Sequence, residues 1–435
     1  MQYVKLNAFQ RIMRLWDQVH PYNAAQAFRL RGEPDFKQID DAWRATLRAM
    51  GLGRAVVRGV EFCHMTFYNG DARAALQRPS AGTPLDQFLS HEMNVAIDPN
   101  DSCPFRAFVL PDNGTYILGV TYHHWVADSA SIRWLLHEWF LRLRDPSRTL
   151  ERAARIPEEG CWHLFGPERG KWELDDAILG LLRYRTRFSR ARHIERPLGD
   201  CTVKLSLHYL DDGLVPVLAA RARENHVTLN DVLLSTIAQA VDHFGANPST
   251  PGHDELALGT VVDLRAMSGK KMEDTFGLFL GFTTTMLRPA ELKSFPRLLR
   301  SVSKQNAWHK QSKAPQTSVL RMAVGLAEAK LVSPRRWAEL YRRRMPIAAG
   351  ISNVNMNRNW AGPYHPTDIL DYYRVAPTGP MLPLLFTPTT LGNKLNFLIT
   401  RQSSLIDDAR NAQIARSISS RLAELANDAR LWNNA

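Results

Sequence analysis

Cysteine is scarce in this sequence. The 435 residues contain four cysteines, Cys63, Cys103, Cys161 and Cys201, and no two of them form a Cys-x-x-Cys pair. Zinc clusters and disulfide frameworks both depend on regularly spaced cysteines. The spacing therefore argues against both kinds of site and predicts reduced, mostly structural thiols.

Long apolar runs are also missing. No stretch reaches the roughly 18 to 20 consecutive apolar residues that a membrane span needs. The first residues, MQYVKLNAFQRIMRLWDQ, are amphipathic and lack the apolar core and cleavage site of a signal peptide. We therefore expect a cytoplasmic protein with no membrane span.

What is present is an ordinary globular composition. Hydrophobic residues make up 45% and charged residues 23% of the chain, which excludes wholesale disorder. A chain of 435 residues is too long for one ordinary hydrophobic core. The length favours two or three domains, and we expect two.

The net charge of +12 comes mainly from arginine. Arginines concentrate in two stretches, Arg183 to Arg196 and Arg335 to Arg344. Each stretch is either a solvated surface or a docking surface for an acidic partner. Nucleic acid is disfavoured as that partner, because neither stretch carries a recognised fold motif or interleaved aromatic residues.

The first part of the chain predicts an α/β layer. Residue patterning predicts strands at Tyr22–Gly32, Arg54–His64, Phe105–Leu110 and Tyr116–Tyr122, and helices at Asp35–Met50 and Ser129–Leu143. From Asp145 to Asp200 the periodicity breaks and proline and charge increase, which is typical of a connector. We place the domain boundary there, which gives domains at 1–165 and 201–435 joined by a basic connector at 166–200.

A second α/β pattern follows the connector. Strands are predicted at Val203–Tyr209, Leu256–Val262, Phe282–Leu287, Ile347–Val354 and Lys394–Thr400, and helices at Val232–Phe244 and Ile406–Leu425. The helix at Val232–Phe244 is preceded by Thr228-Leu229-Asn230-Asp231, a typical helix start. The whole chain is therefore predicted to belong to the α/β class.

Two adjacent histidines, His123 and His124, stand at the end of the strand Tyr116–Tyr122, with Asp128 shortly after them. Histidine suits general-base catalysis because its ordinary pKa of about 6.5 lies near neutral pH. Taken singly, each histidine could be a satisfied core residue, and Asp128 could be the N-cap of the next helix. A metal site is disfavoured, because adjacent strand residues point to opposite faces.

The segment TYHHWVADSASI resembles the His-His-x-x-x-Asp motif of a large acyltransferase superfamily. That superfamily contains nonribosomal peptide synthetase condensation domains, polyketide-associated acyltransferases, wax ester synthases, alcohol acetyltransferases and chloramphenicol acetyltransferase. Other segments that resemble the family follow in its order, namely PYNAAQAFRLRG, TLNDVLLSTIAQA, VVDLR, Phe276-Gly277 and ISNVNM. The resemblance covers nearly the whole chain.

The resemblance implies two chloramphenicol-acetyltransferase-like lobes in a V arrangement, with an active-site tunnel between them. It implies acyl transfer from a thioester donor, either an acyl carrier protein or coenzyme A, to a hydroxyl or amine. Secondary-metabolite or lipid biosynthesis would be the setting. The donor would carry its own phosphopantetheine, and no metal or permanently bound cofactor is expected. The alternative is a catalytically inactive condensation-like module that recruits partner proteins.

The resemblance also assigns roles around the motif. His124 would be the catalytic base, and His123 would be structural and face the core. Asp128 would turn away from the substrate and pair with an arginine that holds the loop, for which Arg265 in VVDLR is the matching residue. A buried carboxylate is costly without such a partner.

Four further residues complete the expected site. Ser352 would donate to the oxyanion of the attacked thioester, with Asn353 supporting it. Trp125 and Ser129 would contact substrate, and Ser129 stands where many members of the family carry glycine. The candidate catalytic residues are His124, Asp128 and Ser352.

Overall fold

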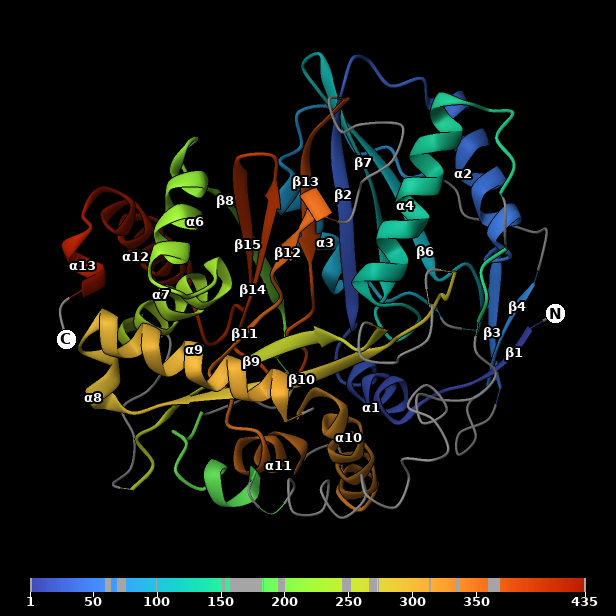
Figure 1. Ribbon diagram of the computed structural model, residues 1–435. Helices are drawn as coiled ribbons and strands as arrows, with labels where there is room; N and C mark the ends of the chain where they lie inside the picture. The colour runs from blue at the N-terminus through green and yellow to red at the C-terminus, as the bar shows by residue number, and fades with distance from the viewer. Residues whose placement is uncertain are drawn as a thin grey trace. The chain divides into compact units, whose positions relative to one another are not determined.

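The computed structural model describes residues 2–58, 64–68, 76–98, 100–150, 153–156, 182, 184–194, 200–244, 252–265, 272, 274–312, 314–333, 336–358 and 368–433. The chain divides into two compact units (Figure 1). Unit 1 comprises Met1–Arg169, Asp263–Leu280 and Asn355–Pro377, and unit 2 comprises Gly170–Val262, Gly281–Val354 and Thr378–Ala435.

Unit 1 contains two antiparallel four-stranded sheets, in the orders β1-β4-β3-β5 and β13-β2-β7-β6. Its strands are β1 (Gln2–Lys5), β2 (Asn23–Arg31), β3 (Arg54–Arg58), β4 (His64–Tyr68), β5 (Asn100–Ser102), β6 (Phe105–Asp112), β7 (Thr115–His123) and β13 (Ile369–Val375). Its helices are α1 (Ala8–Asp17), α2 (Phe36–Met50), α3 (Leu85–Asn94) and α4 (Ser129–Arg144), with a 3-10 turn at Met356–Arg358.

Helices α2 and α4 pack beside the sheet that carries β2 and β7 (Figure 1). Helix α2 begins where Asp35 accepts hydrogen bonds from two backbone N–H groups and ends at Gly51, which adopts the left-handed conformation that favours glycine. The Trp43 and Trp139 rings join the two helices at 4.8 Å between centroids. This packing fixes α4, and with it the turn that follows β7.

The predicted strand Arg54–His64 is instead the start of a hairpin-like pair. Strand β3 ends at Arg58, strand β4 begins at His64, and the two pair antiparallel with Arg58 opposite His64. Apolar residues continue along both arms, so alternation alone did not reveal the reversal. The prediction of one continuous strand is therefore wrong.

Unit 2 is built on a sheet in the order β10-β9-β11-β14-β15-β8, with β12 paired to β14. Its strands are β8 (Val203–Tyr209), β9 (Leu256–Asp263), β10 (Leu280–Leu287), β11 (Ala349–Ile351), β12 (Val354–Asn355), β14 (Leu384–Leu391) and β15 (Lys394–Gln402). Its helices are α6 (Leu214–Glu224), α7 (Leu229–Phe244), α8 (Pro289–Leu292), α9 (Phe295–Gln311), α10 (Ala314–Lys330), α11 (Trp337–Arg344), α12 (Asp408–Asn427) and α13 (Arg430–Asn433).

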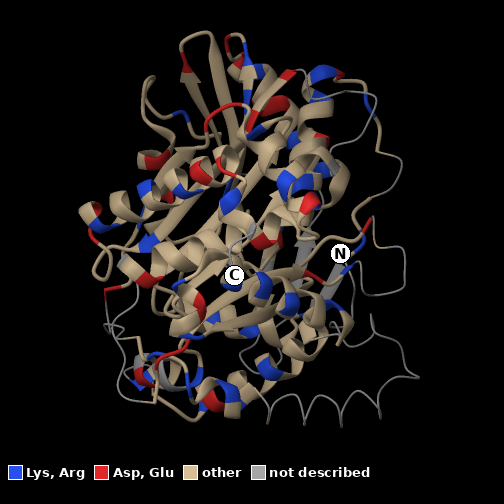
Figure 2. Ribbon diagram, turned by 60° about the vertical axis from the view of Figure 1, so that its left-hand side comes forward, with Lys and Arg blue, Asp and Glu red and all other residues tan. Residues whose placement is uncertain are grey.

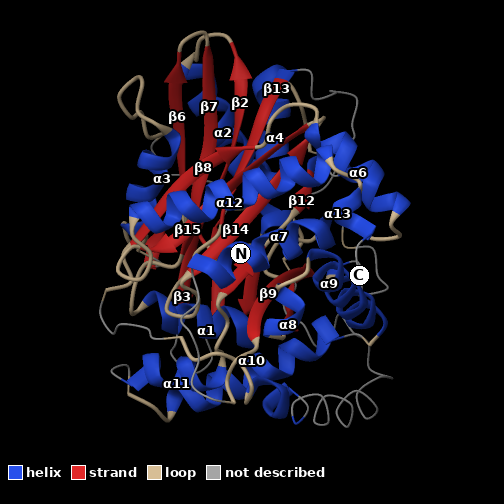
Figure 3. Ribbon diagram, turned by 90° about the vertical axis from the view of Figure 1, so that its left-hand side faces the viewer, coloured by secondary structure: helices blue, strands red, loops and turns tan. Residues whose placement is uncertain are grey.

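The core of unit 2 lies between its sheet and the helices α6, α7, α9 and α12 (Figure 3). Buried side chains on α7 such as Leu234 and Val241 join one apolar cluster with Phe386 of β14 and Ile399 of β15. Strand β11 is parallel to both β9 and β14. A strand with parallel neighbours on both sides is buried on both faces, which accounts for the apolar sequence around Ile351.

The first boundary between the units, after Arg169, falls within the predicted connector at 166–200, and the chain returns to unit 1 twice more. Two later segments, Asp263–Leu280 and Asn355–Pro377, belong to unit 1. The second segment contributes β13, which pairs with β2 from Ile369 opposite Leu30 to Val375 opposite Ala25. Pairing of such distant segments leaves no local pattern in the sequence.

Charged residues are spread over most of the described helices, with acidic positions between the basic ones (Figure 2). None of the helices in the described part of the chain is long and apolar enough to cross a membrane. Within unit 2, Glu328 of α10 lies near both Arg185 and Arg344, at 2.8 and 3.6 Å. The two arginine-rich stretches of the sequence thus meet at one glutamate.

Candidate active site

The two histidines of the motif point to opposite sides of the sheet in unit 1. Strand β7 ends at His123, which lies opposite Asn23 of β2. The His123 side chain is fully buried and its Nε2 donates to the carbonyl of Ile97 at 2.8 Å. Strand alternation turns the next side chain, His124, to the other face. His123 therefore stabilises the end of β7 from inside the core of unit 1.

The ring of His124 lies between two tyrosines. It stacks on Tyr22 with 6.0 Å between centroids and an interplanar angle of 13°, and it meets the edge of Tyr122 at 6.0 Å. Its backbone N–H donates to the carbonyl of Tyr22 at 3.1 Å. The imidazole is only 9% exposed. Its orientation is therefore fixed by packing against both tyrosine rings.

Hydrogen bonding defines which ring nitrogen of His124 is basic. Nδ1 lies 3.1 Å from the carbonyl oxygen of Ala127, and a carbonyl only accepts, so Nδ1 carries the proton. In the neutral ring Nε2 then holds the lone pair. Burial lowers the pKa of His124, despite the opposing effects of the Ala127 carbonyl and Asp128. At neutral pH the ring is thus an uncharged base.

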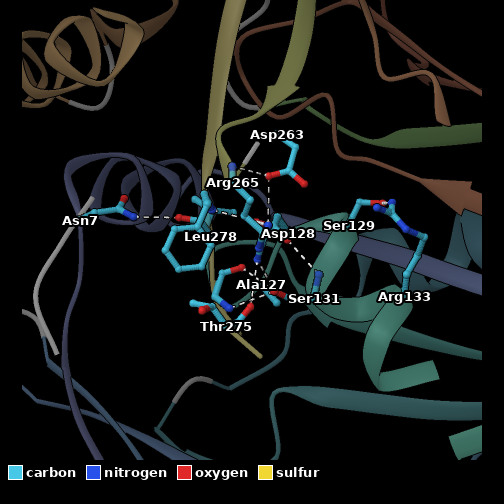
Figure 4. Close-up of polar contacts among 12 residues, drawn as sticks. Asn7, Ala127, Asp128, Ser129, Ser131, Arg133, Asp263, Arg265, Thr275 and Leu278 are labelled. Atoms are coloured by element: carbon cyan, nitrogen blue, oxygen red, sulfur yellow. Dashed lines mark hydrogen bonds and ion pairs between the residues drawn. The ribbon is translucent and has the colours of Figure 1, made fainter. Parts of the chain in front are cut away.

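Asp128 closes the loop after the histidines and begins α4. Its Oδ1 accepts from the backbone N–H of Ser131 at 3.0 Å, which makes it the N-cap. Its Oδ2 accepts from Nη1 of Arg265 at 2.7 Å and from the backbone N–H of Phe279 at 2.8 Å. Capping and pairing with Arg265 are therefore combined in one side chain (Figure 4).

Electrostatics keep Asp128 ionised. Burial alone would raise the pKa of this carboxyl, but Arg265 and the N–H groups of Ser131 and Phe279 outweigh it and lower the pKa. Arg265 also contacts Asp263 at 3.3 Å and lies over the ring of Phe279. A buried carboxylate held in this way serves as a structural anchor of the loop.

Gly277 and Ser131 reinforce the same anchor. The Gly277 carbonyl accepts from the backbone N–H of Asp128 at 2.9 Å, and its N–H donates to Oγ of Ser131 at 3.0 Å. Gly277 has a φ of +148°, and a Cβ there would lie 3.2 Å from the Phe279 ring. Glycine is therefore required at this position. Nη2 of Arg265 also donates to Oγ of Ser131 at 2.8 Å.

Trp125 and Ser129 occupy different environments. The Trp125 side chain is fully buried, 5.4 Å from the His123 ring between centroids, and its carbonyl accepts from Gln10 at 2.9 Å. Ser129 is the first residue of α4 and is partly exposed. Contact of either residue with substrate stays a prediction.

Ser352 and Asn353 lie in unit 2, directly after β11. The backbone N–H of Ser352 donates to the carbonyl of Phe386 at 2.9 Å. Nδ2 of Asn353 donates to Oδ1 of Asn230, at the start of α7, at 3.2 Å. Asn353 thus ties its turn to a helix of its own unit, while the role of Ser352 towards His124 stays a prediction.

Two supporting residues were not identified from the sequence. Ser131 lies three residues after Asp128, a position typical of a helix first turn, and its link to Arg265 depends on contacts that no local pattern reveals. Tyr22 precedes β2, and nothing in the local sequence predicts that its ring stacks on His124. In the described part of the chain, no group of three or more His, Cys, Asp or Glu residues is placed to hold a metal ion.

The chain matches no protein-family model, and comparison with curated proteins gives no significant match. Solved structures do resemble it. The first condensation domain of the calcium-dependent antibiotic synthetase, in complex with substrate analogue 2a, is 15% identical with a TM-score of 0.73, and the alignment covers 100% of both chains. The condensation domain of the monacolin K polyketide synthase MokA is 13% identical with a TM-score of 0.69, covering 98% of each chain.

A third structure is the X-domain from teicoplanin biosynthesis in complex with OxyB. It is 18% identical with a TM-score of 0.64, and the alignment covers 98% of this chain and 94% of that one. Likeness at this level of identity concerns the fold. The chain has the two-lobe, chloramphenicol-acetyltransferase-like α/β fold of condensation domains, and the fold class predicted from the motifs is confirmed.

Proposed function

We propose that this chain, which shares the condensation-domain fold, transfers an acyl group from a thioester donor to a hydroxyl or amine with His124 as general base. One observation carries the proposal. The Nδ1 proton of His124 is engaged by the Ala127 carbonyl, so the lone pair lies on Nε2, and burial lowers the ring's pKa. A neutral, oriented imidazole is the form that accepts a proton near pH 7.

In the proposed reaction, Nε2 of His124 takes the proton from the acceptor hydroxyl or amine as that group attacks the thioester carbonyl. A tetrahedral oxyanion forms and then collapses, breaking the carbon–sulfur bond. The imidazolium returns its proton to the departing thiolate. This sequence requires no acyl-enzyme intermediate.

The groups around His124 would hold this geometry. Asp128 is fully buried and bound to Arg265, and we assign it to positioning of the loop, with no part in proton transfer. Ser352 is our candidate donor to the oxyanion, because a hydroxyl or a backbone N–H can stabilise the charge that develops on the carbonyl oxygen.

The donor would be coenzyme A or the phosphopantetheine arm of an acyl carrier protein. Carrier proteins are typically acidic, and we assign their docking to the surface around Arg185, Arg344 and Glu328, called here the Arg185–Arg344 patch. Side chains of both arginines are about half exposed, at 45% and 50%. Glu328 neutralises part of the charge of the two arginines. Attraction of an acidic carrier protein therefore depends on the positive charge that remains.

A second candidate is a non-catalytic recruitment module. It is favoured by the likeness to the X-domain, a structure solved in complex with OxyB. Such a module would use the fold as a binding surface and would not need a basic Nε2 on His124.

Mass spectrometry separates the two candidates. The purified chain is incubated with acyl-CoA and acylated carrier proteins, each with a panel of small alcohols and amines. Enzyme-dependent esters or amides, together with loss of the donor's acyl group, support acyl transfer. A chain that binds a partner protein but leaves every donor intact would favour the recruitment module.

A further inference from the structure

A cavity of about 620 Å³ lies in unit 2, and all the residues that line it belong to that unit. Its volume is typical of a small-molecule site. Three of the lining residues are arginines. Arg187 lies in the helical residues 184–188, Arg190 in the turn after them, and Arg288 between β10 and α8. Guanidinium groups from two separate segments of the chain therefore converge on one cavity.

Gln305 of α9 holds Arg187 in place at the cavity. Nη2 of Arg187 donates to Oε1 of Gln305, and the same oxygen accepts from the backbone N–H of Met286 at 3.1 Å. Nε2 of Gln305 donates to the Met286 carbonyl at 2.9 Å, so the glutamine amide is fixed by β10. Within the described part of the chain, the other N–H groups of Arg187 make no hydrogen bond. They remain available to a ligand.

Arg190 and Arg288 share one buried carboxylate, that of Glu255. Oε1 of Glu255 lies 3.6 Å from Nη1 of Arg190 and 3.9 Å from Nε of Arg288. Both distances exceed that of a direct hydrogen bond. The side chains of the two arginines are 55% and 69% exposed, whereas that of Glu255 is 9% exposed. The carboxylate therefore attracts both guanidiniums without occupying their donor groups.

Positive charge exceeds negative charge in the cavity lining, where three arginines accompany two glutamates, Glu255 and Glu291. Glu291 is also bound, because its Oε2 accepts from the backbone N–H of Arg288 at 2.7 Å. Burial, together with the charge of Arg190, lowers the pKa of Arg187, and the two glutamates only partly offset these effects. An anion bound in the cavity would compensate the remaining positive charge.

The number of arginines indicates which anion fits. A carboxylate is planar and is matched by a single guanidinium fork, whereas a phosphate group has three acceptor oxygens that point in different directions. Several guanidiniums can therefore bind one phosphate together. Leu182 and Met286 also line the cavity, and its volume leaves room beside a phosphate for an apolar organic group.

We propose that Arg187, Arg190 and Arg288 bind the phosphate group of a small organic phosphate monoester in this cavity. The organic part of the ligand contacts Leu182 and Met286. The monoester is either a free phosphorylated metabolite or coenzyme A, which carries a 3′-phosphate. Because the site is built wholly from unit 2, the proposal goes beyond acyl transfer by His124 and can be tested by binding alone.

Calorimetric titration of the full chain tests the proposal in two arms, at fixed ionic strength and at about pH 8, where the phosphate is a dianion. The first arm compares phenyl phosphate with benzoate, and the phosphate should bind at least about tenfold more tightly. The second arm compares coenzyme A with 3′-dephospho-coenzyme A. A similar preference for coenzyme A identifies it as the source of the phosphate, and equal binding of the two assigns the site to a separate phosphorylated metabolite.

Arg190→Met and Arg288→Met, both at exposed positions, should each weaken binding of phenyl phosphate by about tenfold. Arg300→Met, exposed on α9 and outside the cavity lining, is the matched control and should bind as the wild type does. His124→Ala should also retain binding, so loss of acyl transfer and loss of phosphate binding are separable results. No preference for phenyl phosphate over benzoate, unchanged affinity in both cavity variants, or equal weakening by Arg300→Met would overturn the proposal.

Discussion

Arg265 and Asp128, 137 residues apart in the chain, form a buried ion pair in which Nη1 of the arginine lies 2.7 Å from Oδ2 of the aspartate. The pair attaches the segment Asp263–Leu280 to the start of α4, directly after the loop of His124. Because Asp128 also caps α4, one side chain fixes both the helix and the crossing segment. The geometry of the catalytic loop therefore depends on a residue distant in sequence.

Replacing Asp128 by asparagine should destabilise unit 1 by about 3 to 5 kcal/mol, because Arg265 loses its buried carboxylate partner and keeps the longer contact with the more exposed Asp263. Urea denaturation of the variant and the wild type measures this difference. The double variant Asp128→Asn/Arg265→Gln should lose less than the sum of the two single losses. Additive losses would show that the two side chains do not act as a pair.

Acid should destabilise unit 2 through His309 of α9. Burial, followed by the charges of Arg187 and Arg321, lowers the pKa of His309 from 6.5 to about 4. The unfolded chain therefore binds a proton below pH 6.5 that the folded chain takes up only near pH 4. This difference in pKa contributes about 3 kcal/mol to the free energy of unfolding. The contribution is fully present above pH 6.5 and is lost as the pH falls from 6.5 to 4.

Unfolding free energies measured from pH 7.5 to 4 test this prediction. The variant His309→Gln has no titrating ring, so its stability should fall less steeply over that range. Parallel pH profiles for the variant and the wild type would rule out His309 as the source. His123 and His124, whose pKa values are also lowered by burial, contribute to the slope that remains in the variant.

Gly119 in β7 leaves no room for a side chain. A Cβ at this position would lie 2.2 Å from the Phe108 ring and 2.6 Å from Cβ of Ala27. Gly119→Ala should therefore cost about 1 to 3 kcal/mol by overpacking. Gly259→Ala in β9 is the matched control, because its nearest contact would be 3.4 Å from Ile347. Equal melting temperatures for the two variants would contradict this account.

Charge reversal tests the Arg185–Arg344 patch as the docking surface for a carrier protein. The double variant Arg185→Glu/Arg344→Glu should raise KM for a carrier-bound donor and leave KM for a small thioester mimic unchanged, and the effect should shrink at high salt. Arg430→Glu, 86% exposed on α13, controls for reversal of an exposed arginine outside the patch. Equal effects on both donors would exclude the patch as a docking surface.

Local sequence patterns predicted the helices and strands that have clear start and stop signals in the sequence, such as an N-cap residue. The predicted helix at Ser129–Leu143 is α4 with one further residue, and the strand Val203–Tyr209 is β8 without change. Strands β13 and β14 were missed for physical reasons. Pro388 within β14 argues locally against a strand, and β13 is defined by its long-range pairing with β2.

The candidate site likewise combines features that the local sequence predicts with features that depend on contacts between distant segments. The turn after β7 and the N-cap at Asp128 follow from local sequence, whereas the Asp128–Arg265 pair was expected only from the family resemblance. The stacking of Tyr22 on His124 was not found at all, because it depends on β2 lying beside β7 and leaves no local pattern in the sequence.

The most direct test of the central claim is a single-turnover measurement of acyl transfer by His124→Ala. The variant should lose about 10²- to 10⁴-fold of the wild-type rate, because Nε2 of His124 is the proposed proton acceptor. Circular dichroism should show that it remains folded, since the contacts of Asp128 with Arg265 and Ser131 stay in place. A folded His124→Ala variant that transfers the acyl group at the wild-type rate would contradict the account.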